Sequence, residues 1–282
     1  MNDWWLKFKR AEKHMVDINQ EAVRYAESHP YEFTRLPESK KQIRGRFRIT
    51  EQPDPMIAVM LGDFVHNLRS ALDYVVVACV PKQCRKHASY PIIFQDIFAK
   101  DKNGEFVVKD TQSMENFEVA IKGLHPKARA IIISLQPYNL SLFGRKVDPN
   151  LITLGIISRL ENADKHRQLI TIGCGGRDFT LNFTVPSMPQ LPPIPYHKIL
   201  ATGSDTIDDN TIIPYNFPTE LSSIIQPSQV DMHLTGTVKI LVNVTRTEGN
   251  QPPLRFLLDS FMDSALYEVS GILKRLEFFV RS

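Results

Sequence analysis

The predicted helix over residues 54–80 carries the first group of side chains whose types suit chemistry. His66 and Asp73 lie seven residues apart, which places them within about 20° of each other around a helix. Arg69 lies between them and can reach either one along the helix, and Asn67 extends the same polar side. An exposed helix face usually carries Lys and Glu, which form helices better than the His, Asn, Ser and Asp found here. The group is therefore a solvated face, a buried polar network that fixes how helices pair, or a functional site.

The end of another predicted helix, over residues 148–166, carries a second polar group. Arg159 and His166 are also seven residues apart, with Asn162 and Lys165 beside them. An imidazole beside a guanidinium can bind phosphate, or it can run acid–base chemistry while the guanidinium holds the anion. The alternative is structural, because cations at a helix C-terminus suit the helix dipole and cap the last carbonyl groups.

Few His, Cys, Asp and Glu residues occur at the sequence spacings that are typical of protein metal sites. Asp63 and His66 have the i, i+3 spacing of helix-bundle metal sites, but the comparable pair Glu161 and Asp164 lacks a histidine. The three cysteines complete no zinc-binding spacing with a second Cys or His pair. The sequence contains no glycine-rich phosphate loop, no Gly-x-Ser-x-Gly elbow and no His-Glu-x-x-His motif. We therefore expect no metal and no other cofactor.

Hydrophobic periodicity predicts the helices that must position both polar groups. Apolar residues recur at helical spacing in four long segments: 3–28, 54–80, 148–166 and 252–281. Shorter helices are expected over residues 113–121 and 126–135.

Strand-like alternation occurs in other parts of the chain. Arg44, Arg46 and Arg48 alternate with apolar or small residues, which predicts a strand with one charged side. The segments 168–174 and 178–185 flank Gly175-Gly176-Arg177 and predict a hairpin, and 230–245 predicts one or two further strands.

This order of elements predicts an α+β fold: a bundle of about four main helices with an antiparallel β-sheet inserted before the C-terminal helix. The C-terminal helix has a wide apolar stripe, and the earlier helices are its simplest partners. We therefore expect a single domain over residues 1–282, with a helical core (1–167 and 252–281) and a β-rich insertion (168–246).

Composition and charge narrow the class of protein. Apolar residues make up 43% and charged residues 23% of the 282 residues, which is ordinary globular usage. The formal net charge of +3 is too small to indicate nucleic-acid binding by itself. No apolar run approaches the roughly 18 residues of a membrane helix, and the first residues do not resemble a signal peptide. The low, odd number of cysteines favours a reducing compartment, so we expect a cytoplasmic protein.

Four short segments resemble a widespread family of uncharacterised bacterial proteins. They are GDFVHNLRSALDYVV (62–76), YPIIF (90–94), LQPY (135–138) and LENADKHRQL (160–169). The family's hallmarks are a His-Asn-Leu-Arg-x-Ala-Leu-Asp helix and an Asn-x-Asp-Lys-His-Arg segment, and the resemblance covers roughly residues 55–170. It implies no particular activity.

A second resemblance concerns Arg159-x6-His166, which is similar to the Arg-x(4–6)-His motif of HEPN helical bundles. Many HEPN proteins are metal-independent ribonucleases of toxin and defence systems. The resemblance implies that Arg159 binds phosphate and that His166 is the general acid or base, with His66, Arg69 and Asp73 supporting or extending the site.

The alternative function is a non-catalytic binding or assembly module, so whether the chain is an enzyme stays open. In that case the polar groups join helices, and the strand region 168–245 is the contact surface. The expected partners are RNA or a second copy of the chain, and we expect no association with a membrane.

Overall fold

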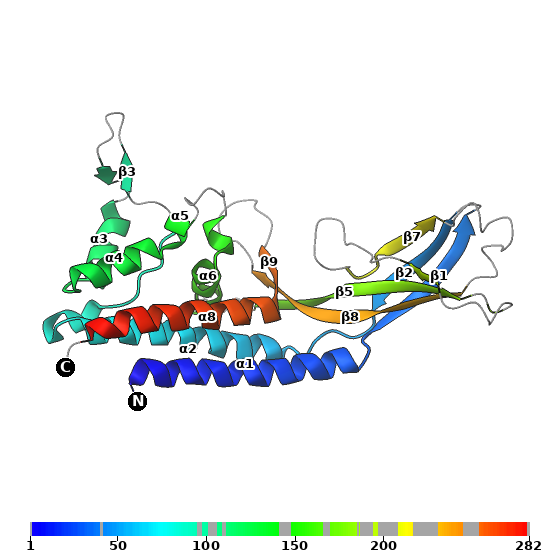
Figure 1. Cartoon of the computed structure of the whole chain (residues 1–282), viewed down its shortest axis with the longest axis horizontal. Helices are drawn as coiled ribbons and strands as arrows, with labels where there is room; N and C mark the ends of the chain where they lie inside the picture. The colour runs from blue at the N-terminus through cyan, green and yellow to red at the C-terminus, as the bar shows by residue number, and fades with distance from the viewer. Residues whose placement is uncertain are drawn as a thin grey trace. The chain divides into compact units, whose positions relative to one another are not determined.

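The structure of the protein is a computed structural model (Figure 1). It describes residues 2–39, 42–94, 98–100, 106–108, 111–140, 148–165, 170–184, 186, 194–196, 208–216, 231–244 and 254–280. Helices and small antiparallel sheets together make an α+β fold, which confirms the predicted class.

The elements follow one another in an order that alternates helical and strand-rich stretches (Figure 1). They are α1 (Asp3–Glu27), β1 (Tyr31–Ser39), β2 (Gln42–Ile49), α2 (Met56–Cys79), η1 (Lys82–His87), β3 (Phe98–Lys100), β4 (Phe106–Val108), α3 (Thr111–Ala120), α4 (Pro126–Ser134), α5 (Pro137–Leu140), η2 (Pro149–Leu151), α6 (Thr153–Lys165), β5 (Thr171–Thr184), β6 (Ile194–Tyr196), β7 (Ile212–Asn216), β8 (Asp231–Val244), β9 (Leu254–Leu257), α8 (Leu258–Leu276) and η4 (Glu277–Phe279).

The chain forms two compact units, each assembled from segments that are distant in sequence. Unit 1 combines Met1–Ile18, Met56–Thr171 and Asn243–Ser282. Unit 2 combines Asn19–Pro55 and Ile172–Val242.

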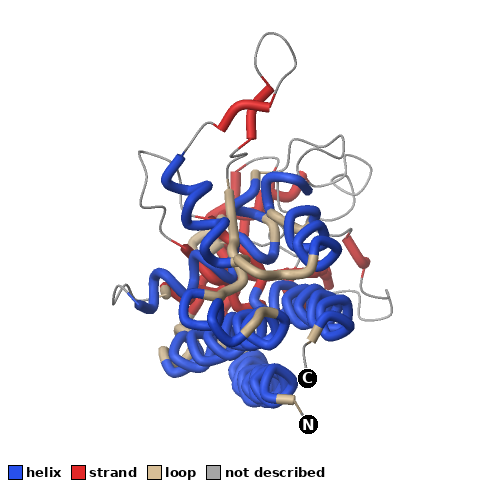
Figure 2. Tube along the Cα trace, turned by 90° about the vertical axis from the view of Figure 1, so that its left-hand side faces the viewer, coloured by secondary structure: helices blue, strands red, loops and turns tan. Residues whose placement is uncertain are grey.

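Unit 1 is built around α2, which packs against both α6 and α8. Leu61, Phe64, Leu68 and Leu72 are completely buried, because their three- and four-residue spacing places them together on the helix. The ring of Phe64 meets Phe261 of α8 edge to face, with ring centroids 6.4 Å apart. Figure 1 shows α2 and α8 running side by side, and Figure 2 shows long helices viewed nearly end-on. No helix in the described part of the chain combines the length and the apolarity that a membrane crossing requires.

Unit 2 contains a three-stranded antiparallel sheet in the order β1-β2-β7. Phe47 and Ile49 of β2 are buried and Arg46 and Arg48 are exposed, so the predicted strand with one charged side is confirmed. A Cβ atom at Gly45 would overlap the ring of Phe33 on β1, so a larger residue there would require this ring to move. Strands β6, β5 and β8 lie next to one another in this order in a second sheet.

The predicted hairpin around Gly175-Gly176-Arg177 is wrong, because residues Thr171–Thr184 form one continuous strand, β5. Gly175 and Gly176 are buried inside this strand. Glycine in a strand allows close approach of neighbouring groups as well as a turn, and the sequence pattern does not separate the two.

Two predicted helix starts are displaced towards the C-terminus. Asp148-Pro149 begins the short turn η2, in which Asp148 accepts a hydrogen bond from Asn150 N, and α6 begins only at Thr153. The segment after Pro253 first forms strand β9, and α8 begins at Leu258. Proline suits the first position of a helix, but it does not fix whether a helix, a short turn or a strand follows.

Candidate functional site

The first polar group of α2 joins this helix to α6 through Glu161. Arg69 Nε lies 3.4 Å from Glu161 Oε2, and His66 Nδ1 lies 4.0 Å from Glu161 Oε1. The Glu161 and Arg69 side chains are 9% and 16% exposed, whereas that of His66 is 56% exposed. The buried carboxylate is therefore held by Arg69, and His66 covers it from the solvent side.

Asp73 extends the same network to the segment that follows η1. Its Oδ1 atom accepts a hydrogen bond from Tyr90 N at 2.8 Å and lies 3.4 Å from Arg69 Nη2. His66, Arg69, Asp73 and Glu161 thus form one chain of contacts, which we call the α2–α6 network. It fixes two helices and the start of the 90–94 segment relative to one another.

Gln136 holds the same segment from its other side. This completely buried amide accepts a hydrogen bond from Ile93 N at 2.8 Å. Its Nε2 atom donates to Pro91 O and to Ile132 O, both at 3.0 Å. The bonds satisfy backbone groups that would otherwise be buried without partners.

Asn67 has a local role. It is buried, and its Nδ2 atom donates to Asp63 O within α2 at 2.7 Å. The predicted binding role of Asn67 therefore has no support from its contacts, since the amide is engaged with its own helix.

The second predicted group lies only partly within the described residues. On α6, Arg159 is half-buried and Asn162 is exposed. Lys165 ends the helix, and its side chain and the whole of His166 lie outside the described residues. The pairing of Arg159 with His166 stays a prediction.

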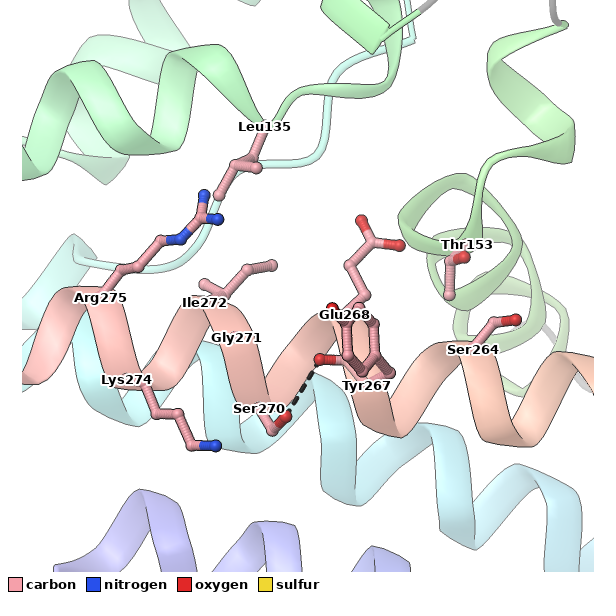
Figure 3. A pocket seen from close by; sticks show the side chains of 10 residues that line it. All are labelled: Leu135, Thr153, Ser264, Tyr267, Glu268, Ser270, Gly271, Ile272, Lys274 and Arg275. Atoms are coloured by element: carbon pink, nitrogen blue, oxygen red, sulfur yellow. Dashed lines mark hydrogen bonds between the residues drawn. The ribbon is translucent and has the colours of Figure 1, made fainter.

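A separate groove of about 470 Å³ runs along α8 in unit 1 (Figure 3). We call it the α8 groove. It is lined by side chains of α8 from Ser264 to Arg275, by Leu135 after α4 and by Thr153 at the start of α6. Glu268 lies inside it, and burial raises the pKa of this carboxyl, with a side-chain hydrogen bond with Thr153 acting in the opposite direction. Among the described residues, none donates a hydrogen bond to Glu268 Oε1, which is buried.

Tyr90 is bound to the α2–α6 network through its backbone, and its hydroxyl is influenced by the charge of Glu268. Its backbone amide is bound by Asp73, and its side chain is completely buried. Burial raises the pKa of the Tyr90 hydroxyl, the charge of Glu268 raises it further, and the charge of Arg69 lowers it. Within the described part of the chain, this hydroxyl has no hydrogen-bond partner.

The sequence did not indicate the roles of four residues of these sites. Tyr90, Gln136 and Glu161 all lie in segments that carry the first resemblance, which was the available signal for them. Glu268 lies outside those segments, and its position within an amphipathic helix gives no indication of a site.

No cluster of three or more His, Cys, Asp or Glu side chains with the geometry of a metal site occurs among the described residues. Comparison with family models, with curated proteins and with solved structures found no match. The local geometry is therefore the basis for the function that follows.

Proposed function

We propose that the chain is a non-catalytic binding or assembly module in which the α2–α6 network is part of the scaffold. The observation that carries the proposal is the engagement of both carboxylates of the network. Glu161 pairs with Arg69, and Asp73 pairs with Arg69 and binds the Tyr90 amide.

The exposure of these groups supports a structural role. A general base must reach a proton of the substrate, but Glu161 is 9% exposed and is already paired with Arg69. A buried, well-connected polar network specifies how helices pair. Removal of one member leaves the remaining buried polar groups without their partner, which destabilises the fold. His66 is 56% exposed and Asp73 is 36% exposed, and the Asp73 carboxylate is engaged by Arg69 and the Tyr90 amide.

The predicted metal-independent ribonuclease is the second candidate function. One observation favours it: Glu161 links the exposed imidazole of His66 to the helix that carries Arg159 and Asn162. In this mechanism Arg159 binds phosphate, His166 transfers the proton and His66 extends the site.

A cleavage assay separates the two functions. Labelled RNA is incubated in EDTA with the wild-type protein, with His166→Ala and with His87→Ala, which removes an exposed histidine of η1 as the matched control. A binding module leaves the RNA intact in all three reactions. Cleavage by wild type and by His87→Ala that is lost in His166→Ala would overturn the proposal and establish the ribonuclease.

A further inference from the structure

The α8 groove contains two opposite charges on one side of a single helix. Glu268 and Arg275 are seven residues apart, which corresponds to two helical turns, or about 10 Å along the axis. Figure 3 shows both side chains projecting from α8 towards the side of Leu135 and Thr153, with Ile272 between them. Lys274 projects in another direction in the same view.

Neither charge has an ion-pair partner among the described residues, although other charges of unit 1 do. Arg69 pairs with Asp73 and Glu161, and Arg129 pairs with Glu118. A carboxylate that is taken out of water without a cation is costly, so Glu268 offers a place where a cationic group would be stabilised.

The buried hydroxyl of Tyr90 does not line the groove, but it is a second buried polar group that the charge of Glu268 affects. It is fully enclosed, it has no hydrogen-bond partner in the described part of the chain, and it experiences the charge of Glu268. Buried polar atoms normally have a hydrogen-bond partner. Among the described residues, no group bonds the Tyr90 hydroxyl or Glu268 Oε1.

The size and composition of the groove restrict what fits. Its volume of about 470 Å³ is in the range of small-molecule sites. A purely anionic ligand would face Glu268, a purely cationic one would face Arg275, and an apolar one would leave both charges unpaired. Ile272 and Leu135 provide an apolar stretch between the two ends.

We propose that the α8 groove binds a small zwitterion whose ammonium group pairs with Glu268 and whose carboxylate pairs with Arg275. A short methylene chain joins the two groups and lies over Ile272. Arg275 binds a carboxylate through its forked donors, and Glu268 accepts hydrogen bonds from the ammonium group. The inference rests on the proposed binding function, for which it supplies a ligand class.

Isothermal titration calorimetry of the full chain with ε-aminocaproate, caproate and hexylamine tests the proposal. The zwitterion has both charged ends, and each of the other two compounds lacks one. We expect ε-aminocaproate to bind at least about tenfold more tightly than either, because each charge-assisted contact contributes that much. Affinity falls as the pH is lowered and Glu268 takes up a proton.

Three variants locate the site. Glu268→Gln reduces the affinity for ε-aminocaproate to that of caproate, and Arg275→Gln reduces it to that of hexylamine. Asp263→Asn, an exposed change on α8 outside the groove, leaves it unchanged. Absent binding, equal binding of the three compounds, or unchanged affinity in Glu268→Gln would overturn the proposal. The RNA assay decides the binding function separately, so the two failures are distinguishable.

Discussion

The α2–α6 network and the α8 groove each contain a buried or partly buried glutamate, but the two glutamates differ in whether a cation lies beside them. Glu161 is nearly inaccessible and is paired with Arg69, and Arg69 in turn contacts Asp73. Glu268 is also partly buried, but it has no cation beside it among the described residues and its pKa is raised. Both residues lie on helices that line the interior of unit 1. The comparison shows that the neighbours of a carboxylate, and not its residue type, decide whether its charge stabilises the fold or is disfavoured by burial.

Removal of the central cation of the network has the largest expected effect. Arg69→Met keeps most of the side-chain volume but leaves Glu161 buried and uncompensated, which costs about 3–5 kcal/mol of unfolding free energy. Urea denaturation measures this loss. The matched control is Arg129→Met, whose pair with Glu118 is 37% exposed on each side and contributes about 1 kcal/mol or less. Equal losses in the two variants would contradict the distinction between buried and exposed pairs.

Removal of Asp73 has an intermediate expected effect. Asp73→Ala takes away the acceptor of the Tyr90 amide and one contact of Arg69, so we expect a loss of about 1–3 kcal/mol. Thermal denaturation followed by circular dichroism checks it. An unchanged melting temperature would show that the network does not fix the 90–94 segment.

Glu268 predicts a pH dependence of stability, and the sign follows from its raised pKa. In the unfolded chain the Glu268 carboxyl loses its proton near the ordinary pKa of Glu, about 4.3, whereas in the folded chain it keeps the proton to a higher pH. The wild type therefore loses stability as pH rises through this interval, and Glu268→Gln does not. Unfolding free energies should agree below the ordinary pKa and favour the variant at neutral pH. A constant difference across the pH range would contradict the raised pKa.

His66→Ala has the smallest expected effect. The imidazole is 56% exposed and 4.0 Å from Glu161, so its contribution to the unfolding free energy is about 0.5 kcal/mol or less. Urea denaturation beside Arg69→Met measures it. A loss as large as that of Arg69→Met would place His66 at the centre of the network.

The parts of the fold with strong periodicity were predictable. The predicted helix over 3–28 is α1, and the predicted helix over 54–80 is α2, because apolar spacing and flanking prolines agree there. Strand β5 was not predictable as one strand, since Gly175-Gly176 is equally compatible with a turn and with a buried strand position. Strand β1 was missed, because its pairing with β2 depends on tertiary contacts as well as on local pattern.

The candidate site was predictable within one helix and not between helices. A helical wheel places His66, Arg69 and Asp73 on one side of α2, and their contacts agree with that placement. Glu161 entered the sequence argument only as a poor metal ligand, because spacing along a chain does not show which faces of two helices meet. Tyr90 is in a loop, where no periodicity indicates that its amide binds Asp73.

The most direct test of the scaffold role is a double-mutant cycle on the pair between α2 and α6. Unfolding free energies of wild type, Arg69→Met, Glu161→Gln and the double variant give the coupling energy of the two side chains. We predict a coupling of about 1–3 kcal/mol, with the double variant more stable than the sum of the single losses implies. A coupling within about 0.3 kcal/mol of zero would show that Arg69 and Glu161 do not hold the helices together, and it would contradict the account.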